Sequence, residues 1–161
     1  MAVLLSIKPQ YCELIASGKK IIELRKSRPK IQTPFKCYIY CTLSGSNEFF
    51  KEDCKGDIAE WNRSKMALKK GKVIGEFVCD NISDYPYFDS GFSISRGYVT
   101  ITDRMRQKMC LDVSELEDYG NCKKLYGWHI SGLIIYDNPK ELSEFMHTRP
   151  PQSWYYVKEL I

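Results

Sequence analysis

The sequence predicts an α+β fold, a small and mainly antiparallel β-barrel with short helices at its periphery. Five or six apolar, β-rich runs of strand length are spread along the chain, with two or three short helical segments among them. These segments lack the regular strand–helix alternation of a doubly wound parallel sheet. With 161 residues, 43% of them hydrophobic, the chain has enough apolar material for the core of one domain with a long insertion.

The N-terminal part predicts the order strand, helix, strand, strand. Ala2–Ile7 is an apolar run of strand length. Pro9 ends that strand and suits the first position of a helix, which Gly18 is placed to end. Lys20–Lys26 and Phe35–Thr42 are the next two β-rich runs, each followed by turn residues.

The remainder of the chain predicts the other strands and the segments between them. The expected strands are Lys72–Asn81, Leu125–Tyr136 and Trp154–Leu160. Residues 44–70 are expected to form an insertion with a helix that begins after Asp57. The other segments are an aromatic loop at 83–98, a stretch at Val99–Cys110 that suits strand or helix equally, and a helical turn at Ser114–Tyr119 with Ser114 as its cap.

The charge of the chain is unevenly distributed along the sequence. The net charge is +4, from 24 basic and 20 acidic residues. Residues 1–72 carry 15 basic and 7 acidic residues, a net of +8, and residues 73–161 carry 9 and 13, a net of −4. Such a distribution indicates a basic face that attracts polyanions such as nucleic acid, or else ordinary charges on a mixed surface.

The sequence also indicates where the protein resides. No apolar run reaches the roughly 18 residues that a membrane-spanning helix needs, so no membrane association is expected. The N-terminus has no basic segment and no small-residue cleavage site, and we interpret it as structure rather than as a signal peptide. Seven cysteines, an odd number, favour reduced thiols and a cytoplasmic protein.

The most distinctive segment is Gly18–Arg25, where a helix is expected to pass directly into a strand. Side chains alternate along a strand, so Glu23 and Arg25 share a face. Lys20 joins them only if it lies in the turn before the strand, or if a bulge redirects it. A cation, a carboxylate and a guanidinium would then lie together, although a Glu–Arg pair on one face is also typical of an ordinary surface ion pair.

The helix before this segment offers a second cationic feature. Lys8 occupies the expected N-cap position, for which lysine is poorly suited, so the first backbone N–H groups lack a side-chain acceptor. These groups and the Lys8 ammonium suit either an anion such as phosphate or simple hydration.

The segment SIKPQYCELIASGKKIIELRKS resembles the N-terminal signature of ASCH domains, a nucleic-acid-associated branch of the PUA-like superfamily. The signature is a strand, a helix and Gly-x-Lys-(Thr)-x-Glu-x-Arg. Gly18, Lys20, Glu23 and Arg25 match it, and Ile21 replaces the usual threonine. The runs GKVIGEFVCDNI, YGWHISGLIIYDNP and PPQSWYYV also look like parts of such a domain, so the resemblance implies a single ASCH/PUA-like domain over residues 1–161.

The resemblance implies binding of RNA, of single-stranded nucleic acid or of a nucleotide or nucleoside, in a cleft beside the motif helix. The candidate binding residues are Lys8, Tyr11, Lys20, Glu23, Arg25 and Trp128. In this hypothesis Lys20 and Arg25 hold phosphate, while Glu23 orients Arg25 or accepts a hydrogen bond from an exocyclic amine of cytosine or adenine. Tyr11 and Trp128 supply rings on which bases stack, or belong to the core.

Two other functional classes stay open. Some ASCH-like proteins resemble amidohydrolases that act on N4-acylated cytidine, and others are linked to RNA cleavage. Lys20 matches the motif lysine of the amidohydrolase group, Glu23 stands where that group has a threonine, and Glu76 is a candidate for its distant glutamate. If the protein is an enzyme, Lys20 and Glu23 are the catalytic candidates; a protein-interaction module is the third hypothesis, and the oligomeric state stays open.

The sequence predicts no cofactor and no metal site. It contains no G-x-S-x-G motif, P-loop, dinucleotide fingerprint or C-x-x-C pair. Cys37 and Cys41 share a strand face but are too far apart for a compact zinc site with His129. His129 itself is either a general acid or base or, as is usual for a single histidine on a strand, structural or solvated.

Overall fold

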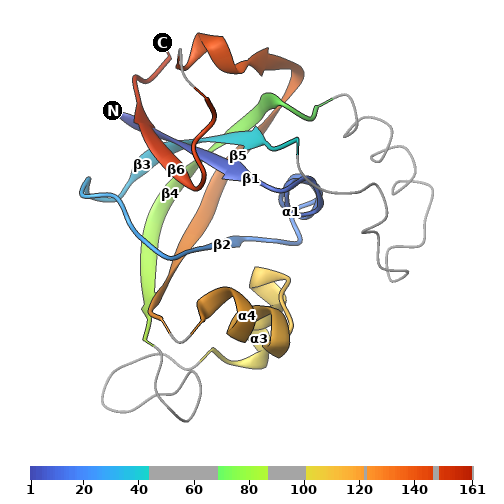
Figure 1. Cartoon of the computed structure of the whole chain (residues 1–161), viewed down its shortest axis with the longest axis vertical. Coiled ribbons are helices and arrows are strands. Elements are labelled where there is room, and N and C mark those ends of the chain that lie inside the picture. Colours follow the sequence, from blue (N-terminus) through green and yellow to red (C-terminus); the bar gives the residue numbers. More distant parts are fainter. Residues whose placement is uncertain (44–68, 87–100, 122, 147–148, 161) are drawn as a thin grey trace, which may run out of the picture. The chain divides into compact units, whose positions relative to one another are not determined.

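The computed structural model describes residues 1–43, 69–86, 101–121, 123–146 and 149–160 (Figure 1). Its strands are β1 (Ala2–Ile7), β2 (Ile22–Arg25), β3 (Phe35–Cys41), β4 (Lys72–Tyr85), β5 (Leu125–Glu141) and β6 (Trp154–Val157). Its helices are α1 (Pro9–Ala16), α3 (Asp103–Met109), α4 (Val113–Gly120) and the short 3₁₀ helix η1 (Leu142–Glu144). None of the helices in these described ranges is both long enough and apolar enough to cross a membrane.

The six strands form one mixed sheet in the order β2-β5-β4-β3-β1-β6. β1 is parallel to β3 and antiparallel to β6, and β2 is antiparallel to β5. The predicted α+β class is confirmed. The described part of the sheet is open, with β2 and β6 at its ends, so the expected closed barrel is not formed there.

The chain divides into two compact units. The first unit comprises Met1–Ser17, Lys36–Phe77 and Gly132–Ile161, and the second comprises Gly18–Phe35 and Val78–Ser131. The first therefore contains β1, α1, β3 and β6, and the second contains β2, α3 and α4, while β4 and β5 each contribute residues to both. The segment Gly18–Arg25 belongs entirely to the second unit.

The core of the first unit gathers around β1, whose six residues are all buried. A strand buried on both faces reads as a continuous apolar run, which is why Ala2–Ile7 was easy to predict. The main cluster consists of Ala2, Leu4, Tyr38, Tyr40, Val73 and Val157. β4 and β5 approach closely at Gly75, where an added Cβ would lie 2.4 Å from the carbonyl oxygen of Ile134.

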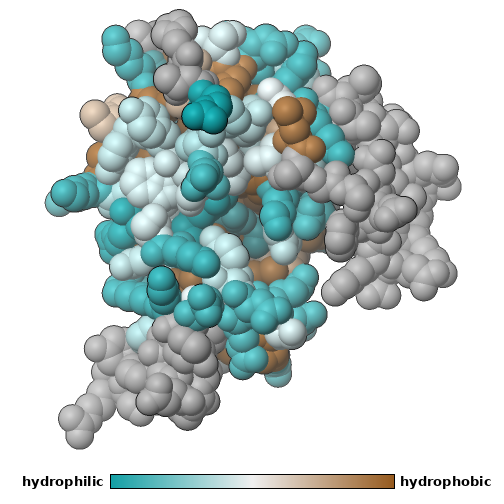
Figure 2. Space-filling view, viewed as in Figure 1, coloured by the Kyte–Doolittle hydropathy of each residue, from teal (hydrophilic) through white to brown (hydrophobic). Residues whose placement is uncertain are grey.

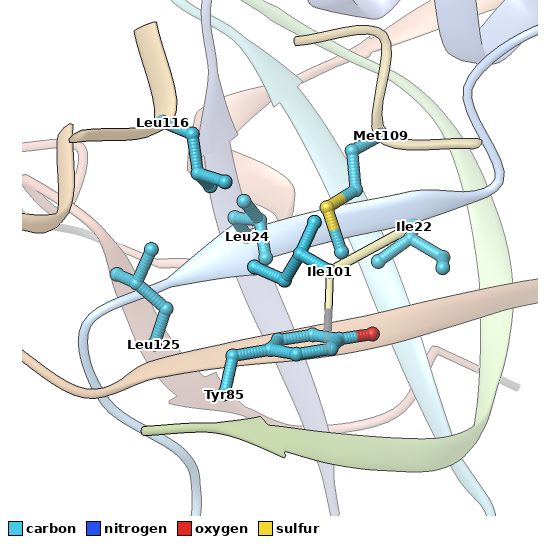
Figure 3. Close-up of a cluster of buried hydrophobic side chains, with 7 residues drawn as sticks. All are labelled: Ile22, Leu24, Tyr85, Ile101, Met109, Leu116 and Leu125. Atoms are coloured by element: carbon cyan, nitrogen blue, oxygen red, sulfur yellow. The ribbon is translucent and has the colours of Figure 1, made fainter. Parts of the chain in front are cut away.

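The core of the second unit lies against one face of β2. Figure 3 shows its side chains pointing toward one another: Ile22, Leu24, Tyr85, Ile101, Met109, Leu116 and Leu125. Ile22 and Leu24 supply the β2 part of this cluster, so the alternation of the strand directs Glu23 and Arg25 to its other face. The visible surface in Figure 2 is mainly hydrophilic over the described residues, in keeping with these buried apolar strands.

The first helix agrees with its prediction. α1 begins at Pro9 and ends at Ala16, Ser17 is its C-cap, and Gly18 follows with φ +73°, a left-handed conformation that glycine adopts without strain. β2 is shorter than predicted, because it begins at Ile22 and leaves Lys20 in the connection before it.

Other elements differ from their predictions. The ambiguous stretch Val99–Cys110 contains the helix α3, whose cap is Thr102. α4 begins two residues earlier than a Ser114 cap would give, because Asp112 is its cap. β4 continues to Tyr85, into the predicted aromatic loop, and the helix expected after Asp57 lies outside the described residues.

Candidate functional site

The connection after α1 and the strand β2 bring three charged side chains into contact. Lys20 lies before the strand, as one of the two predicted arrangements required. Its Nζ is 3.4 Å from Oε2 of Glu23, and Nη2 of Arg25 is 3.0 Å from Oε1 of the same carboxylate. The Glu23 carboxylate thus lies between two cations, and we call these three residues the motif cluster.

The motif cluster is buried. The exposed fractions of the side chains are 2% for Lys20, 8% for Glu23 and 7% for Arg25. The interpretation of Glu23 and Arg25 as an ordinary surface ion pair is therefore wrong. Buried charges persist only where partners compensate their lost hydration, so Lys20 and Arg25 both depend on Glu23. With two cations and one carboxylate, the cluster has a formal excess of one positive charge.

Two helices of the second unit provide further partners. Nζ of Lys20 donates a hydrogen bond of 2.5 Å to the carbonyl oxygen of Met109, at the end of α3. The negative end of a helix dipole favours a cation at this position. The neighbouring backbone is also fixed, since Ile21 N donates to the carbonyl oxygen of Lys108 at 2.9 Å. From α4, the hydroxyl of Tyr119 donates to the carbonyl oxygen of Leu24 at 3.2 Å.

Tyr119 is a residue that the sequence did not single out. Burial raises the pKa of its phenol, and Glu23 adds to this effect while Arg25 opposes it. The phenol therefore stays protonated and remains a donor to β2 at neutral pH. The only sequence signal for its position was the Asp112-x-x-Glu115 pattern, in which each side chain accepts a hydrogen bond from the backbone N–H of the other.

The Glu23 carboxylate is not fully satisfied. Its Oε2 is buried and makes no hydrogen bond within the described residues, although Nζ of Lys20 is 3.4 Å away. Across the ladder Glu23 stands opposite Trp128, which is completely buried and packs edge-on against Phe35 with ring centroids 5.7 Å apart. The motif cluster therefore combines two cations with an acceptor oxygen that has unused capacity.

Comparison with known proteins identifies the fold. Neither a protein-family model nor a curated protein sequence matches the chain. Among solved structures, the crystal structure of ASCH from Zymomonas mobilis matches with a TM-score of 0.64 at 16% identity, over 98% of this chain and 88% of that chain. The chain has the ASCH fold. The resemblance predicted from the Gly18–Arg25 segment is thus confirmed as a likeness of fold.

Two variants of the Zymomonas mobilis ASCH protein match in the same way. A tyrosine-to-phenylalanine variant gives a TM-score of 0.64 and covers 98% of this chain and 91% of that chain. A serine-to-alanine variant gives 0.63, with 98% and 89% covered, and both are 16% identical to this chain. The structural match therefore covers nearly the whole chain and is not confined to the Gly18–Arg25 segment.

In this ASCH fold, Lys8 and Tyr11 belong to the first unit, whereas Lys20, Glu23, Arg25 and Trp128 belong to the second. Lys8 is exposed at the N-cap of α1, and no side chain caps the helix, as the sequence predicted. Its backbone carbonyl oxygen accepts from the N–H groups of Tyr11 and Cys12, both at 3.0 Å.

Glu76 has its own partners in the first unit. Its carboxylate accepts from the hydroxyl of Tyr136 at 2.5 Å and lies 3.1 Å from Nζ of Lys36. Burial opposes its ionisation, but these hydrogen bonds hold the pKa of Glu76 below its ordinary value. The same contact raises the pKa of Lys36. Glu76 is therefore an ionised carboxylate held by two donors of its own unit.

His129 faces away from the motif cluster. Its Nδ1 is 2.6 Å from Oδ1 of Asp80, and this hydrogen bond lowers the pKa of the Asp80 carboxyl. His129 stands opposite Ile22 in the β2–β5 ladder, and Glu23 stands opposite Trp128, so alternation places the two sites on different faces. Over the described ranges, no three His, Cys, Asp or Glu side chains form a group suited to a metal ion.

Proposed function

We propose that this protein binds RNA or single-stranded nucleic acid, and that Lys20, Glu23 and Arg25 recognise a nucleotide. The ASCH fold and the sequence motif support this class of function. The single observation that carries the proposal is the buried Oε2 of Glu23, which has no hydrogen bond within the described residues although two cations flank the carboxylate. In this proposal, an amine of the ligand donates to Oε2 of Glu23, and its phosphate contacts Lys20 and Arg25.

The chemistry of the motif cluster favours particular bases. A carboxylate accepts well from the exocyclic amine of cytosine, and the amine of adenine offers the same donor. Uracil has a carbonyl oxygen at the corresponding position, which would face the Glu23 carboxylate without a proton between them. A buried acceptor left without a partner costs about 1–3 kcal/mol. We therefore expect oligocytidylate to bind about tenfold or more tightly than oligouridylate.

Filter binding over a series of salt concentrations tests the proposal. Lys20→Met removes one cation, and we expect its affinity for oligocytidylate to fall about tenfold at low salt. The slope of log affinity against log salt should become shallower by about 0.7, because one phosphate contact is lost. Circular dichroism and urea unfolding confirm that the variant is folded.

Lys158→Met is the matched control, because Lys158 is an exposed lysine of the first unit and its replacement changes the net charge equally. Its affinity and salt slope should stay close to those of the unmodified protein. Absence of binding at low salt, or an equal loss in both variants, would contradict the proposal.

One contact favours hydrolysis as the second candidate function. Lys20, which matches the motif lysine of the ASCH-like amidohydrolases, and Glu23, which stands at their threonine position, lie 3.4 Å apart and are almost completely buried. Incubation with N4-acetylcytidine, and separately with labelled RNA, tests this alternative. Turnover that is lost in Lys20→Met would make the protein a hydrolase, and an absence of product in both assays would exclude these two reactions. A nuclease-resistant pull-down of an acidic protein would instead favour an interaction module.

A further inference from the structure

Two buried cysteines of the first unit lie near the backbone carbonyl of Ile7. Cys12 lies on α1, Cys41 is the last residue of β3, and both are completely buried. Sγ of Cys12 donates to the carbonyl oxygen of Ile7 at 3.5 Å, and Ile7 is the parallel-strand partner of Cys41. The N–H of Thr42 donates to the same oxygen at 2.9 Å. One carbonyl oxygen thus holds both the Cys12 sulfur and the Cys41–Thr42 peptide.

The Cys12 thiol also affects the ionisation of Cys41. It lowers the pKa of Cys41, against the opposing effect of burial. The positive charges of Lys69 and Lys70 act in the same direction. A thiol that forms thiolate more readily, next to a second thiol, is the arrangement found in redox-active cysteine pairs.

We propose that Cys12 and Cys41 form an oxidation site that closes into a reversible intramolecular disulfide. Cys79 and Cys37 do not share this arrangement. Burial raises the pKa of Cys79 to about 12, so its thiol stays protonated. Cys37 lies four residues before Cys41 on the same strand, about 13 Å away along it. This inference does not depend on the proposed nucleic-acid binding.

The reaction with hydrogen peroxide proceeds in two balanced steps. The Cys41 thiolate attacks one peroxide oxygen, the O–O bond breaks, and a sulfenic acid forms as hydroxide leaves. The Cys12 thiolate then attacks the sulfenic sulfur, the S–S bond forms and a second hydroxide leaves. The protons released by the two thiols convert both hydroxides to water. The peroxide is reduced by two electrons, and an added dithiol such as dithiothreitol reverses the oxidation.

The burial of both thiols makes the reaction depend on local opening of α1. This helix has only eight residues, no side chain caps its N-terminus, and no acidic residue lies in its first turn. Such a helix opens more readily than a capped one, and the peroxide reaches the thiols in the open state. The closed disulfide ties α1 to β3 and opposes further opening. Oxidation therefore fixes the helix that carries Tyr11 at its N-terminal end.

Peptide mapping without reduction tests the inference on the unmodified chain. After hydrogen peroxide treatment and alkylation of the remaining thiols, we expect one peptide pair that joins Cys12 to Cys41, lighter by two hydrogen atoms. Dithiothreitol should restore both thiols. Hydrogen exchange of the α1 amides should be at least about tenfold slower in the oxidised protein, because opening is blocked.

Variants define the site further. Cys12→Ser and Cys41→Ser should each abolish the linked peptide, and Cys79→Ser, the matched control, should retain it. A disulfide to any other cysteine would overturn the inference. So would sulfinic or sulfonic acid at Cys41 with Cys12 still open to alkylation. Because the mapping uses the unmodified chain, the result holds even if a serine variant fails to fold.

Discussion

Glu23 is the residue on which the motif cluster depends. Its carboxylate contacts both Lys20 and Arg25, and all three side chains are at least nine-tenths buried. Glu23→Gln keeps the shape of the side chain but removes its charge, so two cations remain buried without a counter-ion. We expect the free energy of unfolding to fall by about 3–5 kcal/mol, as measured by urea denaturation.

Lys20→Met provides the comparison within the same cluster. It leaves the neutral Glu23–Arg25 pair in place and removes the contact of Lys20 with Glu23 and its hydrogen bond to Met109, so its loss should be smaller, about 1–2 kcal/mol. Equal losses in the two variants would contradict the view that Glu23 balances both cations.

At the residue scale, the sequence predicts what is local. Alternation placed Glu23 and Arg25 on one face, and Lys20 joins them from the turn, which is one of the two arrangements that the sequence left open. The partners of the cluster could not be predicted, because Lys20 and Met109 are 89 residues apart and Leu24 and Tyr119 are 95 residues apart. No local pattern specifies contacts over such separations.

At the scale of the elements, β4 and β5 approach each other closely at Gly75. Gly75→Ala would bring a Cβ to 2.4 Å from the Ile134 carbonyl oxygen, and a backbone atom in a sheet cannot move aside cheaply. We expect a loss of about 2–3 kcal/mol in the free energy of unfolding by urea. Gly18→Ala is the comparison: its Cβ would meet nothing within 4 Å, and only its positive φ costs energy, about 1 kcal/mol. A smaller loss for Gly75→Ala than for Gly18→Ala would contradict the close approach.

The elements that the sequence predicted best have clear local signals. α1 lies between Pro9 and Gly18, and β1 is a continuous apolar run. β4 was predicted to end at Asn81 because Ser83 and Asp84 are polar, and their strand conformation depends on partners elsewhere. Asp84, for example, contacts Lys124. The cap of α4 was misplaced because both Asp112 and Ser114 suit an N-cap.

At the scale of the whole molecule, the uneven charge of the sequence is redistributed. The first unit carries 12 basic and 11 acidic residues, a net of +1, and the second carries 12 and 9, a net of +3. Each unit contains residues from both halves of the chain, so the large difference in net charge between the halves is not kept between the units. The basic character is greater in the unit that contains the motif cluster.

The stability of the whole chain should depend on pH through Glu76. The folded pKa of this carboxyl lies below its ordinary value of 4.5, so its contribution is complete above that value. The contribution is lost as the pH falls through the lower folded pKa. Glu76→Gln should therefore reduce the free energy of unfolding by about 1 kcal/mol at pH 7 and by less at pH 3.

Asp137→Asn, which replaces an exposed carboxylate on β5, is the matched control for this pH dependence. Urea unfolding between pH 3 and pH 7 should show nearly the same decrease in the free energy of unfolding with falling pH as in the unmodified protein. If the free energy of unfolding of Glu76→Gln falls with pH as strongly as that of the unmodified protein, groups other than Glu76 cause the acid sensitivity.

The most direct measurement is an NMR titration that follows the buried Arg25 guanidinium and the Trp128 indole. We expect single-stranded oligocytidylate to shift the Arg25 resonance in a saturable manner, with oligouridylate doing so only at higher concentration. The Trp128 resonance, opposite Glu23, should follow the same curve. Saturable binding that leaves both resonances unchanged would place the nucleic acid elsewhere and contradict the proposed role of the motif cluster.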